Sequence, residues 1–469
     1  MNPVFIDNVE YQTNLSEAEI KVARADIQKG QNLSKSCLSR LAVAVKHKDT
    51  QIMHLMTEVL LTHPMILLAA SVQANNKVKQ NKRCSLEQCF EASKKLNLFN
   101  KIEEISEVYP KKKSSGGVRM IHKPSFLHRV AQTAVKNVME VFFQPRKWQY
   151  THQGVPRAIR HIKERFNSGH HYFCHLDIKS FYEHFQLEEL IKFLPLPKEV
   201  VENVVSATCI TTLLSPRHGT SDTSDQNMAY SHGQTQTKKG HENNKGEALL
   251  YNYPLYNEDK LLHIASLGIP QGSICSPIVA AYCVSYLAWN QGPGECVCNY
   301  ADDIIAQAKT AKAVKNCGKR FMDAVGTLPG GSFTLNVKAI GHVKDGVVLL
   351  GHHLILKNGV LKISPSPKAI NGLTEKMAKL DVRISKLVFQ LDKSKGMDKA
   401  EIIRNLVYMQ AHLVGWAAAF SECDNVKRET DTYQHGIYVW CHTLGYAFGD
   451  IAAAVTPDMI SQIDIYGLS

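Results

Sequence analysis

The sequence has 469 residues, of which 44% are hydrophobic, and its formal net charge is +12. A chain of this length and composition can bury a substantial core and suggests roughly two to four structural units. The excess of Lys and Arg favours a polyanionic partner, because cations that neutralise phosphates release condensed counterions. A basic protein that binds no polyanion remains an open alternative.

The sequence gives no sign of export or membrane insertion. The N-terminus has no basic segment followed by an apolar one, so we expect no signal peptide. The longest apolar run, HPMILLAASV, is far too short to span a bilayer. The 12 cysteines include no C-x-x-C pair, which argues against a zinc site and fits a reduced compartment. We therefore expect a soluble cytoplasmic protein without a membrane partner.

Residues 1–104 are predicted to form a helical N-terminal region. Two stretches have apolar residues spaced as on one face of a helix, SKSCLSRLAVAVKH and IMHLMTEVLLTH. A third stretch, SLEQCFEASKKLNLF, begins with Ser85, which is a typical helix N-cap residue.

A basic β-hairpin is predicted over residues 109–124, YPKKKSSGGVRMIHKP. A Ser-Ser-Gly-Gly turn separates three lysines from the strand-like sequence VRMIH. The segment from residue 111 to 123 contains five Lys or Arg residues and no acid. Such a run is either a solvated face or a ligand-binding tip, and the Gly-Gly pair would let a ligand approach the backbone closely.

The next segments combine an amphipathic helix with a strand that ends in an acid. The helix is predicted in SFLHRVAQTAVKNVMEVFF, and a strand over residues 172–176 is followed by Asp177. An acid at this end of a buried strand is typical of a ligand site, and a helix N-cap is the alternative. His170, His171 and His175 are interpreted as ordinary strand or surface residues, because no matching ligand set is visible nearby.

A polar insertion and a buried helix follow. Residues 215–248 are rich in polar residues and Gly and almost lack aliphatic side chains, so they cannot bury a core. They are predicted to be disordered or to be ordered by a partner. The sequence LGIPQGSICSPIVAAYCVSYLAWN predicts a helix from Ser276, its N-cap, to about Trp289. The turn before it places Gln271 and Gly272 where a flat ligand could approach the backbone.

The stretch CVCNYADDIIAQAK places Asp302 and Asp303 at the tip of a predicted hairpin. Together with Asp177 they form a set of three carboxylates, which cannot all stay ionised in a half-buried site without a cation. Mg²⁺ binds carboxylate oxygens together with substrate phosphates, and two ions about 4 Å apart stabilise the attacking and leaving oxygens in phosphoryl transfer. The residues therefore predict a site for two Mg²⁺ ions, for which Mn²⁺ could substitute.

Three motifs occur in an order that closely resembles the palm of reverse transcriptases: DIKSFY, GIPQGSICSP and YADD. The resemblance is to the bacterial group that includes group II intron, retron and phage-defence enzymes. It covers about residues 105–425 except the polar insertion. It implies an α+β, right-hand polymerase fold with fingers and palm over residues 105–365 and a helical thumb and C-terminal tail over residues 366–469. The palm would be an antiparallel sheet with helices.

The resemblance also implies a role for each residue that matches a family motif. Asp177 and Asp302 would be metal ligands, and Asp303 a third or supporting carboxylate. Tyr182 matches the steric-gate position, where an aromatic ring clashes with a ribose 2′-hydroxyl and so favours dNTPs. Tyr300 would lie beneath the primer terminus.

A further set of residues would contact the incoming nucleotide. Cations would offset the charge that develops on the triphosphate. Lys338 matches a lysine proposed to protonate the pyrophosphate leaving group. Packing or a surface charge is the alternative role for these positions. The set comprises Lys111 or Lys113, Arg119, Gln271, Gly272 and Lys338, besides Tyr182.

Departures from related groups narrow the lineage. The sequence before Asp177, THQGVPRAIRHIKERF, lacks the Asn-Ala-x-x-His pattern of retron enzymes, and an intact PQG argues against the diversity-generating group. Too few residues follow the thumb for a long helical-repeat extension. The chain resembles the defence-associated ("unknown group") bacterial reverse transcriptases best.

We therefore expect an RNA-directed DNA polymerase that acts in antiviral defence. Its expected partners are a non-coding RNA, the nascent DNA, dNTPs and either a partner protein or a second copy of the chain. Three alternatives stay open: a group II intron-like or retron enzyme, template-independent or protein-primed DNA synthesis, and an RNA-binding scaffold whose polymerisation is incidental.

Overall fold

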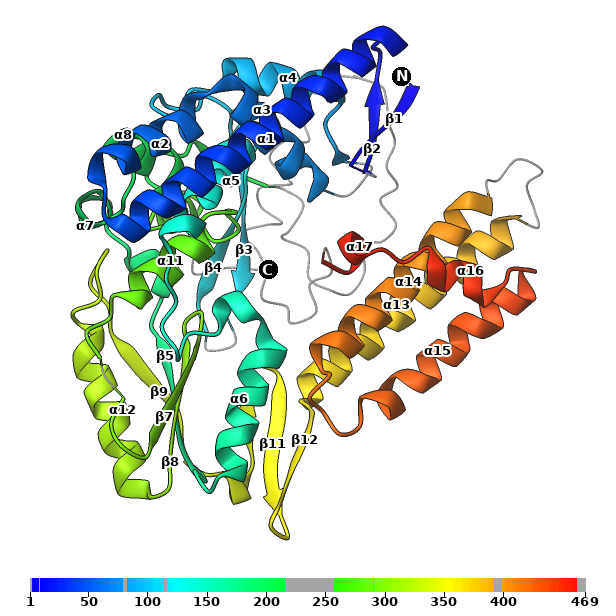
Figure 1. Cartoon of the computed structure of the whole chain (residues 1–469). Helices are drawn as coiled ribbons and strands as arrows, with labels where there is room; N and C mark the ends of the chain where they lie inside the picture. Colours follow the sequence, from blue (N-terminus) through cyan, green and yellow to red (C-terminus); the bar gives the residue numbers. More distant parts are fainter. Residues whose placement is uncertain are drawn as a thin grey trace. The chain divides into compact units, whose positions relative to one another are not determined.

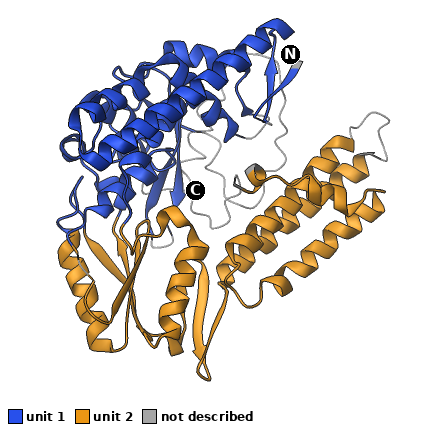
Figure 2. Cartoon of the chain, viewed as in Figure 1, with its two compact units in different colours: residues 1–145, 180–288, 326–333 blue, residues 146–179, 289–325, 334–469 orange. Residues whose placement is uncertain are grey.

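In the computed structural model the chain forms two structural units, and each unit is built from three separate segments (Figure 2). Unit 1 comprises residues 1–145, 180–288 and 326–333, and unit 2 comprises residues 146–179, 289–325 and 334–469. The structure describes residues 2–7, 9–78, 82–113, 116–215, 257–289, 291–391 and 399–461. The predicted polar insertion therefore lies outside the described residues, except for Ser215.

Unit 1 combines a set of N-terminal helices with small sheets (Figure 1). Its described helices are α1 (Glu17–His47), α2 (Thr50–Thr62), α3 (Pro64–Asn76), α4 (Leu86–Lys95), α5 (Phe126–Phe142), α7 (Leu187–Phe193), α8 (Lys198–Val200), α10 (Glu258–Ala265) and α11 (Ser276–Ser285), with the 3₁₀-helix η3 (Phe181–His184) and the π-helix η4 (Val201–Val205). Its described strands are β1 (Asn2–Ile6), β2 (Val9–Thr13), β3 (Ser106–Lys112), β4 (Val118–Lys123) and β6 (Thr212–Leu214).

The N-terminal region begins with a β-hairpin, so the prediction that residues 1–104 form a helical region is wrong for β1 and β2. β1 and β2 pair antiparallel. Val4, Val9 and Tyr11 are buried against the helices behind the hairpin, whereas Phe5 is exposed. Burial thus alternates with a period of two, which is the period of a strand. Helices do follow from α1 onward.

The start of α4 is set by a local signal that the sequence displays. The Ser85 hydroxyl accepts a hydrogen bond from the Gln88 backbone amide, and the Gln88 side-chain oxygen accepts one from the Ser85 backbone amide. This reciprocal arrangement is a capping box, which satisfies backbone donors that the first helical turn leaves unpaired. The N-cap prediction at Ser85 is confirmed.

The basic hairpin is confirmed, whereas the prediction that Ser276 is the N-cap of the buried helix is wrong. β3 and β4 pair antiparallel, and β6 adds a parallel strand beside β3. The amphipathic helix predicted after the hairpin is α5. α11, by contrast, has Cys275 as its N-cap and ends at Ser285, so Ser276 is its first helical residue. The Ser276 side chain is fully buried, and its hydroxyl makes no capping hydrogen bond within the described residues.

Unit 2 contains a four-stranded sheet, whose strands lie within the predicted fingers and palm, and a set of C-terminal helices. Its described strands are β5 (Tyr172–Ile178), β7 (Glu295–Tyr300), β8 (Asp303–Ala308), β9 (Leu335–His342), β10 (Val347–Leu349), β11 (His352–Lys357) and β12 (Val360–Pro365). Its described helices are α6 (Val155–Asn167), α12 (Ala311–Val325), α13 (Pro367–Leu391), α14 (Lys399–Ala419), α15 (Val426–Thr443), α16 (Phe448–Ala453) and α17 (Pro457–Ser461), with the short turns η2 (Thr151–Gln153) and η5 (Val343–Asp345).

The large sheet of unit 2 is antiparallel throughout, with strand order β7-β8-β5-β9. Its two faces are covered by different helices (Figure 1). α6 packs on the face that carries Phe173 and Ile305, together with the meander β10-β11-β12. α12 packs on the opposite face, where Gly318 lies against the Cys174 side chain. β5 is therefore a central strand, buried on both faces.

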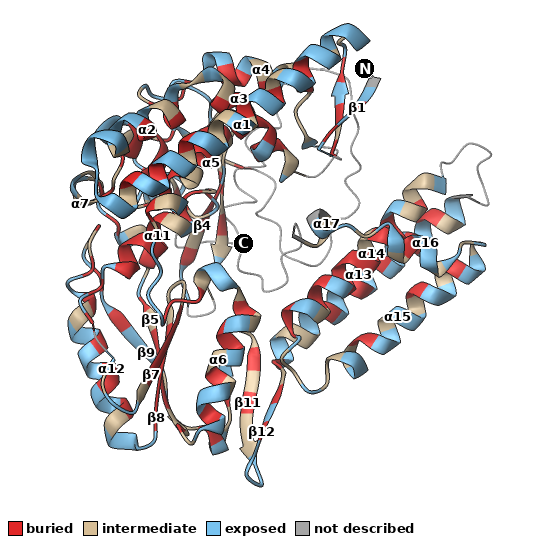
Figure 3. Ribbon diagram, viewed as in Figure 1, coloured by how far each residue is buried: buried red, intermediate tan, exposed pale blue. Residues whose placement is uncertain are grey.

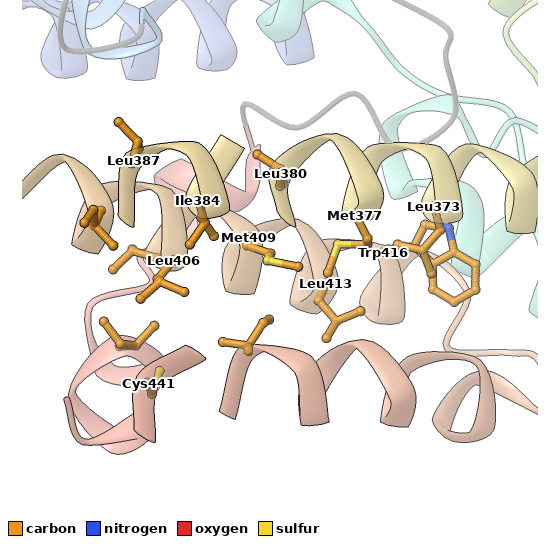
Figure 4. Packing of buried hydrophobic residues seen from close by; sticks show 14 of the residues in the cluster. Leu373, Met377, Leu380, Ile384, Leu387, Leu406, Met409, Leu413, Trp416 and Cys441 are labelled. Carbon is orange, nitrogen blue, oxygen red and sulfur yellow. The ribbon is translucent and has the colours of Figure 1, made fainter. Parts of the chain in front are cut away.

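The C-terminal helices pack around a core of their own (Figure 4). Leu380 and Ile384 of α13 face Leu406 and Met409 of α14 (Figure 4), and buried residues recur along both helices (Figure 3). The turn after α14 is fixed to the rest of unit 2, because Glu422 forms an ion pair of 2.7 Å with Arg160 of α6. These helices occupy the predicted thumb. The three-part division into domains stays a prediction.

Among the described residues, no single helix is long and apolar enough to cross a membrane. α2 and α3 meet the length and composition requirements for a membrane span only when the two helices are counted together, and the chain bends by 63° between them.

We predict that the core of the C-terminal helices depends on Leu406, which is fully buried. Leu406→Ala should lower the free energy of unfolding by about 2–5 kcal/mol, because it removes apolar contacts and leaves a cavity. Val414→Ala on the same helix is the control, since Val414 is 37% exposed. Denaturant unfolding followed by tryptophan fluorescence measures both. Equal losses in the two variants would contradict the packing described.

Candidate active site

The three predicted carboxylates meet at one end of the large sheet of unit 2. Asp177 in β5 and Asp303 in β8 are direct cross-strand partners. Asp302 belongs to the two-residue turn that joins β7 to β8, and its carbonyl accepts a hydrogen bond of 3.0 Å from the Ile178 amide. The sheet register therefore brings together acids that lie far apart in the sequence.

The turn that presents Asp302 has a strained backbone held by two neighbours. Ala301 has φ of 53°, in the left-handed region that non-glycine residues rarely adopt. Its amide donates a hydrogen bond of 2.8 Å to the Thr151 hydroxyl, and its carbonyl accepts one of 2.8 Å from the Asn299 side chain. Asn299 is almost fully buried. Sequence reasoning missed both supporting residues, because neither belongs to a motif with a recognisable spacing.

Lys338 reaches the carboxylates from β9. Its Nζ lies 2.9 Å from Asp177 Oδ1 and 2.9 Å from Asp303 Oδ1. The register of β9 against β5 shifts beside His175, and Lys338 is the extra residue between paired neighbours. A bulge of this kind re-aims a side chain. Lys338 is thus directed at two of the three acids.

His175 is a fifth residue at the site: it is a strand residue, as predicted, and it also contacts one of the acids. Its Nε2 lies 2.7 Å from Asp303 Oδ1, and the residue is 8% exposed. His175 and Asp177 are two residues apart on β5, so their side chains lie on one face of the sheet. The spacing of a histidine two residues before the acid does not by itself predict that the histidine contacts the site.

The charges of the site are unevenly compensated. Burial, followed by the negative charges of Asp303 and Asp177, raises the pKa of Asp302 to about 6. Burial also opposes ionisation of Asp303, but the His175 hydrogen bond and Lys338 outweigh it and lower that pKa. Burial opposes the charge of Lys338 as well, yet the two carboxylates raise its pKa. The least compensated negative charge is therefore that of Asp302.

The donor set suits a hard divalent cation. Among the described residues, no three His, Cys, Asp or Glu side chains are arranged closely enough to hold a metal ion in the present positions. The ligands available are nevertheless carboxylate oxygens, which Mg²⁺ and Mn²⁺ prefer. The Asp302 carboxylate interacts with its own backbone amide, and no side chain in the described ranges donates to it. Asp177 and Asp302 would hold the ion, with Asp303 beside them.

Tyr300 is placed next to the acids by the same hairpin. It is the last residue of β7 and pairs in register with Asp303. Its ring is partly buried against the core beneath α6, and burial raises its pKa. The position agrees with a side chain that supports the carboxylate turn.

The remaining predicted site residues belong to unit 1 and form a group of their own. The Tyr182 carbonyl accepts a hydrogen bond of 2.9 Å from the Ile269 amide, and the Gln271 carbonyl accepts one of 2.6 Å from the His122 amide. Gly272 has φ of +104°, and a Cβ there would lie 2.2 Å from the His122 carbonyl oxygen. Only glycine fits this contact. The PQG turn is therefore fixed against β4.

The basic hairpin contributes the cations of this group. Lys111 and Arg119 are direct partners across β3 and β4. Lys113 forms an ion pair of 3.0 Å with Glu183, the residue after Tyr182. Arg119 Nε is buried and has no hydrogen-bond partner within the described ranges. The hairpin, the PQG turn and the Tyr182 segment are thus linked within unit 1, and Tyr182 follows Asp177 by five residues in the chain.

Comparisons with solved structures find polymerases of low similarity. A Sicinivirus RNA-dependent RNA polymerase is 12% identical, with a TM-score of 0.29, over 74% of this chain and 69% of that chain. Telomerase from Candida albicans, solved with a fragment of telomeric RNA, is 11% identical, with a TM-score of 0.33, over 75% of this chain and 64% of that chain. These values are too low to add to a family assignment.

No curated protein matches the sequence. Residues 109–353 match the family described as reverse transcriptase (RNA-dependent DNA polymerase). This range is more than half of the chain, and it contains the sheet end with Asp177, Asp302 and Asp303. The chain therefore belongs to the reverse transcriptase family of RNA-directed DNA polymerases.

Proposed function

We propose that this reverse transcriptase performs its reaction at Asp177, Asp302 and Asp303 with two Mg²⁺ ions, for which Mn²⁺ can substitute. The observation that carries the proposal is the juxtaposition of these acids, where Asp177 and Asp303 are partners in register and Asp302 occupies the adjoining turn. Reverse transcriptases use divalent metal ions and copy an RNA template into a DNA product. The family assignment supports the reaction, and the donor set supports the metal.

The chemistry is the attack of a primer 3′-oxygen on the α-phosphorus of a dNTP, with pyrophosphate as the leaving group. Bound divalent ions would supply stabilisation of the attacking and leaving oxygens. Asp177 and Asp302 would bind these ions, and Asp303 would support them. Lys338 carries the proton that pyrophosphate would take, and it would have to leave its ion pairs with Asp177 and Asp303 to deliver it.

The unit 1 residues would bind and select the nucleotide. Lys111 or Lys113 and Arg119 would neutralise the triphosphate. Arg119 is supported in this role by its Nε, which has no hydrogen-bond partner in the part of the chain that the structure describes. Tyr182 would exclude the ribose 2′-hydroxyl. Gln271 and Gly272 would line the nascent base pair, and the hydrogen bond that fixes the PQG turn to His122 supports a rigid surface there.

We further propose that the enzyme acts in antiphage defence and makes DNA with a dedicated non-coding RNA. This rests on the resemblance of its motifs to the defence-associated group and on a net charge of +12, which suits a bound polyanion. A group II intron-like or retron role and synthesis without a conventional template are the competing proposals. Sequencing the RNA and DNA that co-purify from the native cell distinguishes them. DNA unrelated to any bound RNA would refute RNA-templated synthesis.

We predict that Asp302→Ala with Asp303→Ala abolishes DNA synthesis while the protein stays folded. The change removes ligands for the ions that stabilise the transition state, so primer extension should fall by at least about 10³-fold. The assay is extension of a labelled primer on an RNA template, with the biological activity measured in parallel. A double variant that keeps full biological activity would show that the chain acts as a scaffold.

We predict that Lys338→Met destabilises the protein in the absence of divalent ions. The substitution removes the cation shared by Asp177 and Asp303, and because Lys338 is 43% exposed the expected loss is only about 1 kcal/mol. Added Mg²⁺ should stabilise the variant more than the wild type. Thermal unfolding with and without Mg²⁺ measures this, with Lys362→Met, an exposed lysine of β12, as the control. If Mg²⁺ changes the thermal stability of all three proteins equally, Lys338 does not compensate the charges of Asp177 and Asp303.

We predict that Tyr182 sets the choice between dNTPs and rNTPs. Tyr182→Ala should raise the relative rate of rNTP incorporation by at least about tenfold, because the ring no longer opposes the 2′-hydroxyl. Tyr182→Phe keeps the ring and should discriminate like the wild type. Single-nucleotide incorporation kinetics measure kcat/KM for both nucleotides. Unchanged discrimination in Tyr182→Ala would exclude the steric-gate role.

A further inference from the structure

His175 makes the most direct side-chain contact with the carboxylates apart from Lys338. Its Nε2 lies 2.7 Å from Asp303 Oδ1, and only 10% of its side chain is exposed. A carboxylate without a proton can only accept hydrogen bonds, so the imidazole donates. A short bond from a buried donor to a charged acceptor is among the stronger hydrogen bonds in proteins.

The strand register explains why the bond is diagonal. On β5 and β8, Asp177 is opposite Asp303 and His175 is opposite Ile305. All four side chains lie on one face of the sheet, and a long side chain can reach the diagonal neighbour on the next strand. His175 therefore approaches Asp303 from within the sheet, whereas Lys338 approaches it from β9.

The two donors share one oxygen of Asp303. Lys338 Nζ is 2.9 Å and His175 Nε2 is 2.7 Å from Oδ1. Lys338 has a long flexible stem, and 43% of its side chain is exposed. The buried imidazole is the more rigid of the two, because its ring has few rotamers and little room. It is thus the contact that fixes the Asp303 carboxylate.

We propose that His175 is a positioning residue of the polymerase site. It holds the Asp303 carboxylate in position beside Asp302 and Asp177, where Asp303 would support a divalent cation bound by those two acids. The inference rests on the proposed function of these acids. Hydrogen-bonding partners of metal-binding carboxylates orient the ligands, and their loss weakens metal affinity by about 10–100-fold.

The test is Mn²⁺ binding to the protein without nucleic acid, measured by electron paramagnetic resonance. His175→Leu keeps an apolar side chain of similar bulk but has no donor, so the Kd for Mn²⁺ should rise by about 10-fold or more. His175→Gln can donate from a similar position and should stay within about threefold of the wild type. The matched control is His170→Leu, because His170 is also 8% exposed but contacts Ser168 and no carboxylate of the site.

The outcomes separate this inference from the proposed function. If His175→Leu and His170→Leu both bind Mn²⁺ as the wild type does while Asp302→Ala does not, His175 has no positioning role. If His175→Leu is too unstable to study, His175→Asn and His175→Gln replace it. Weakened Mn²⁺ binding in His175→Asn with normal binding in His175→Gln supports the positioning role of His175. Equal Mn²⁺ binding in these two variants overturns that role. Wild-type protein that binds Mn²⁺ through Asp302 but extends no primer would refute the proposed function alone.

Discussion

Three carboxylates at one end of a sheet repel one another, and much of the structure around them offsets that repulsion. The register of β5 and β8 places Asp177 opposite Asp303, and the tight β7–β8 turn adds Asp302 beside them. Neighbouring anions in a half-buried position are costly unless cations or hydrogen bonds compensate them. The bulge that carries Lys338 supplies such a charge within the protein. The compensation is incomplete at Asp302, which leaves that acid suited to a metal.

The scaffold keeps this arrangement rigid. β5 is central in its sheet, and α6 and α12 cover opposite faces of it. The strained turn at Ala301 is held by Thr151 and Asn299, so that strain is balanced by fixed hydrogen bonds. Sites built on packed strands hold their geometry better than sites on loops. In unit 1 the same principle applies to the PQG turn, which is bonded to β4 through His122.

The features that could be predicted from sequence are those that depend on residues close together in the chain. The hairpin with Asp302 and Asp303, the basic hairpin and the cap at Ser85 follow from turn residues, alternation and capping, which act over a few residues. The order of the three motifs identified the family because it combines several such signals. The first strands were missed because a short alternating stretch before long helices is a weak signal.

The supporting residues of the site could not be predicted, because their roles depend on pairing between distant strands. His175 contacts Asp303, its diagonal neighbour on β8. The direction of the Lys338 side chain depends on one extra residue in β9. Asn299 and Thr151 act on the backbone of Ala301, which no side-chain pattern reveals. Such contacts are set by register and bulges, and a single sequence does not display either.

The central claim is that Asp177 and Asp302 bind the catalytic ions. The most direct measurement is an anomalous diffraction map of crystals of the enzyme with primer–template, Mn²⁺ and a non-hydrolysable dNTP. The account predicts Mn²⁺ peaks within about 2.3 Å of carboxylate oxygens of Asp177 and Asp302, with Lys338 Nζ displaced from its ion pairs. A bound nucleotide with no anomalous peak in contact with either acid would contradict it.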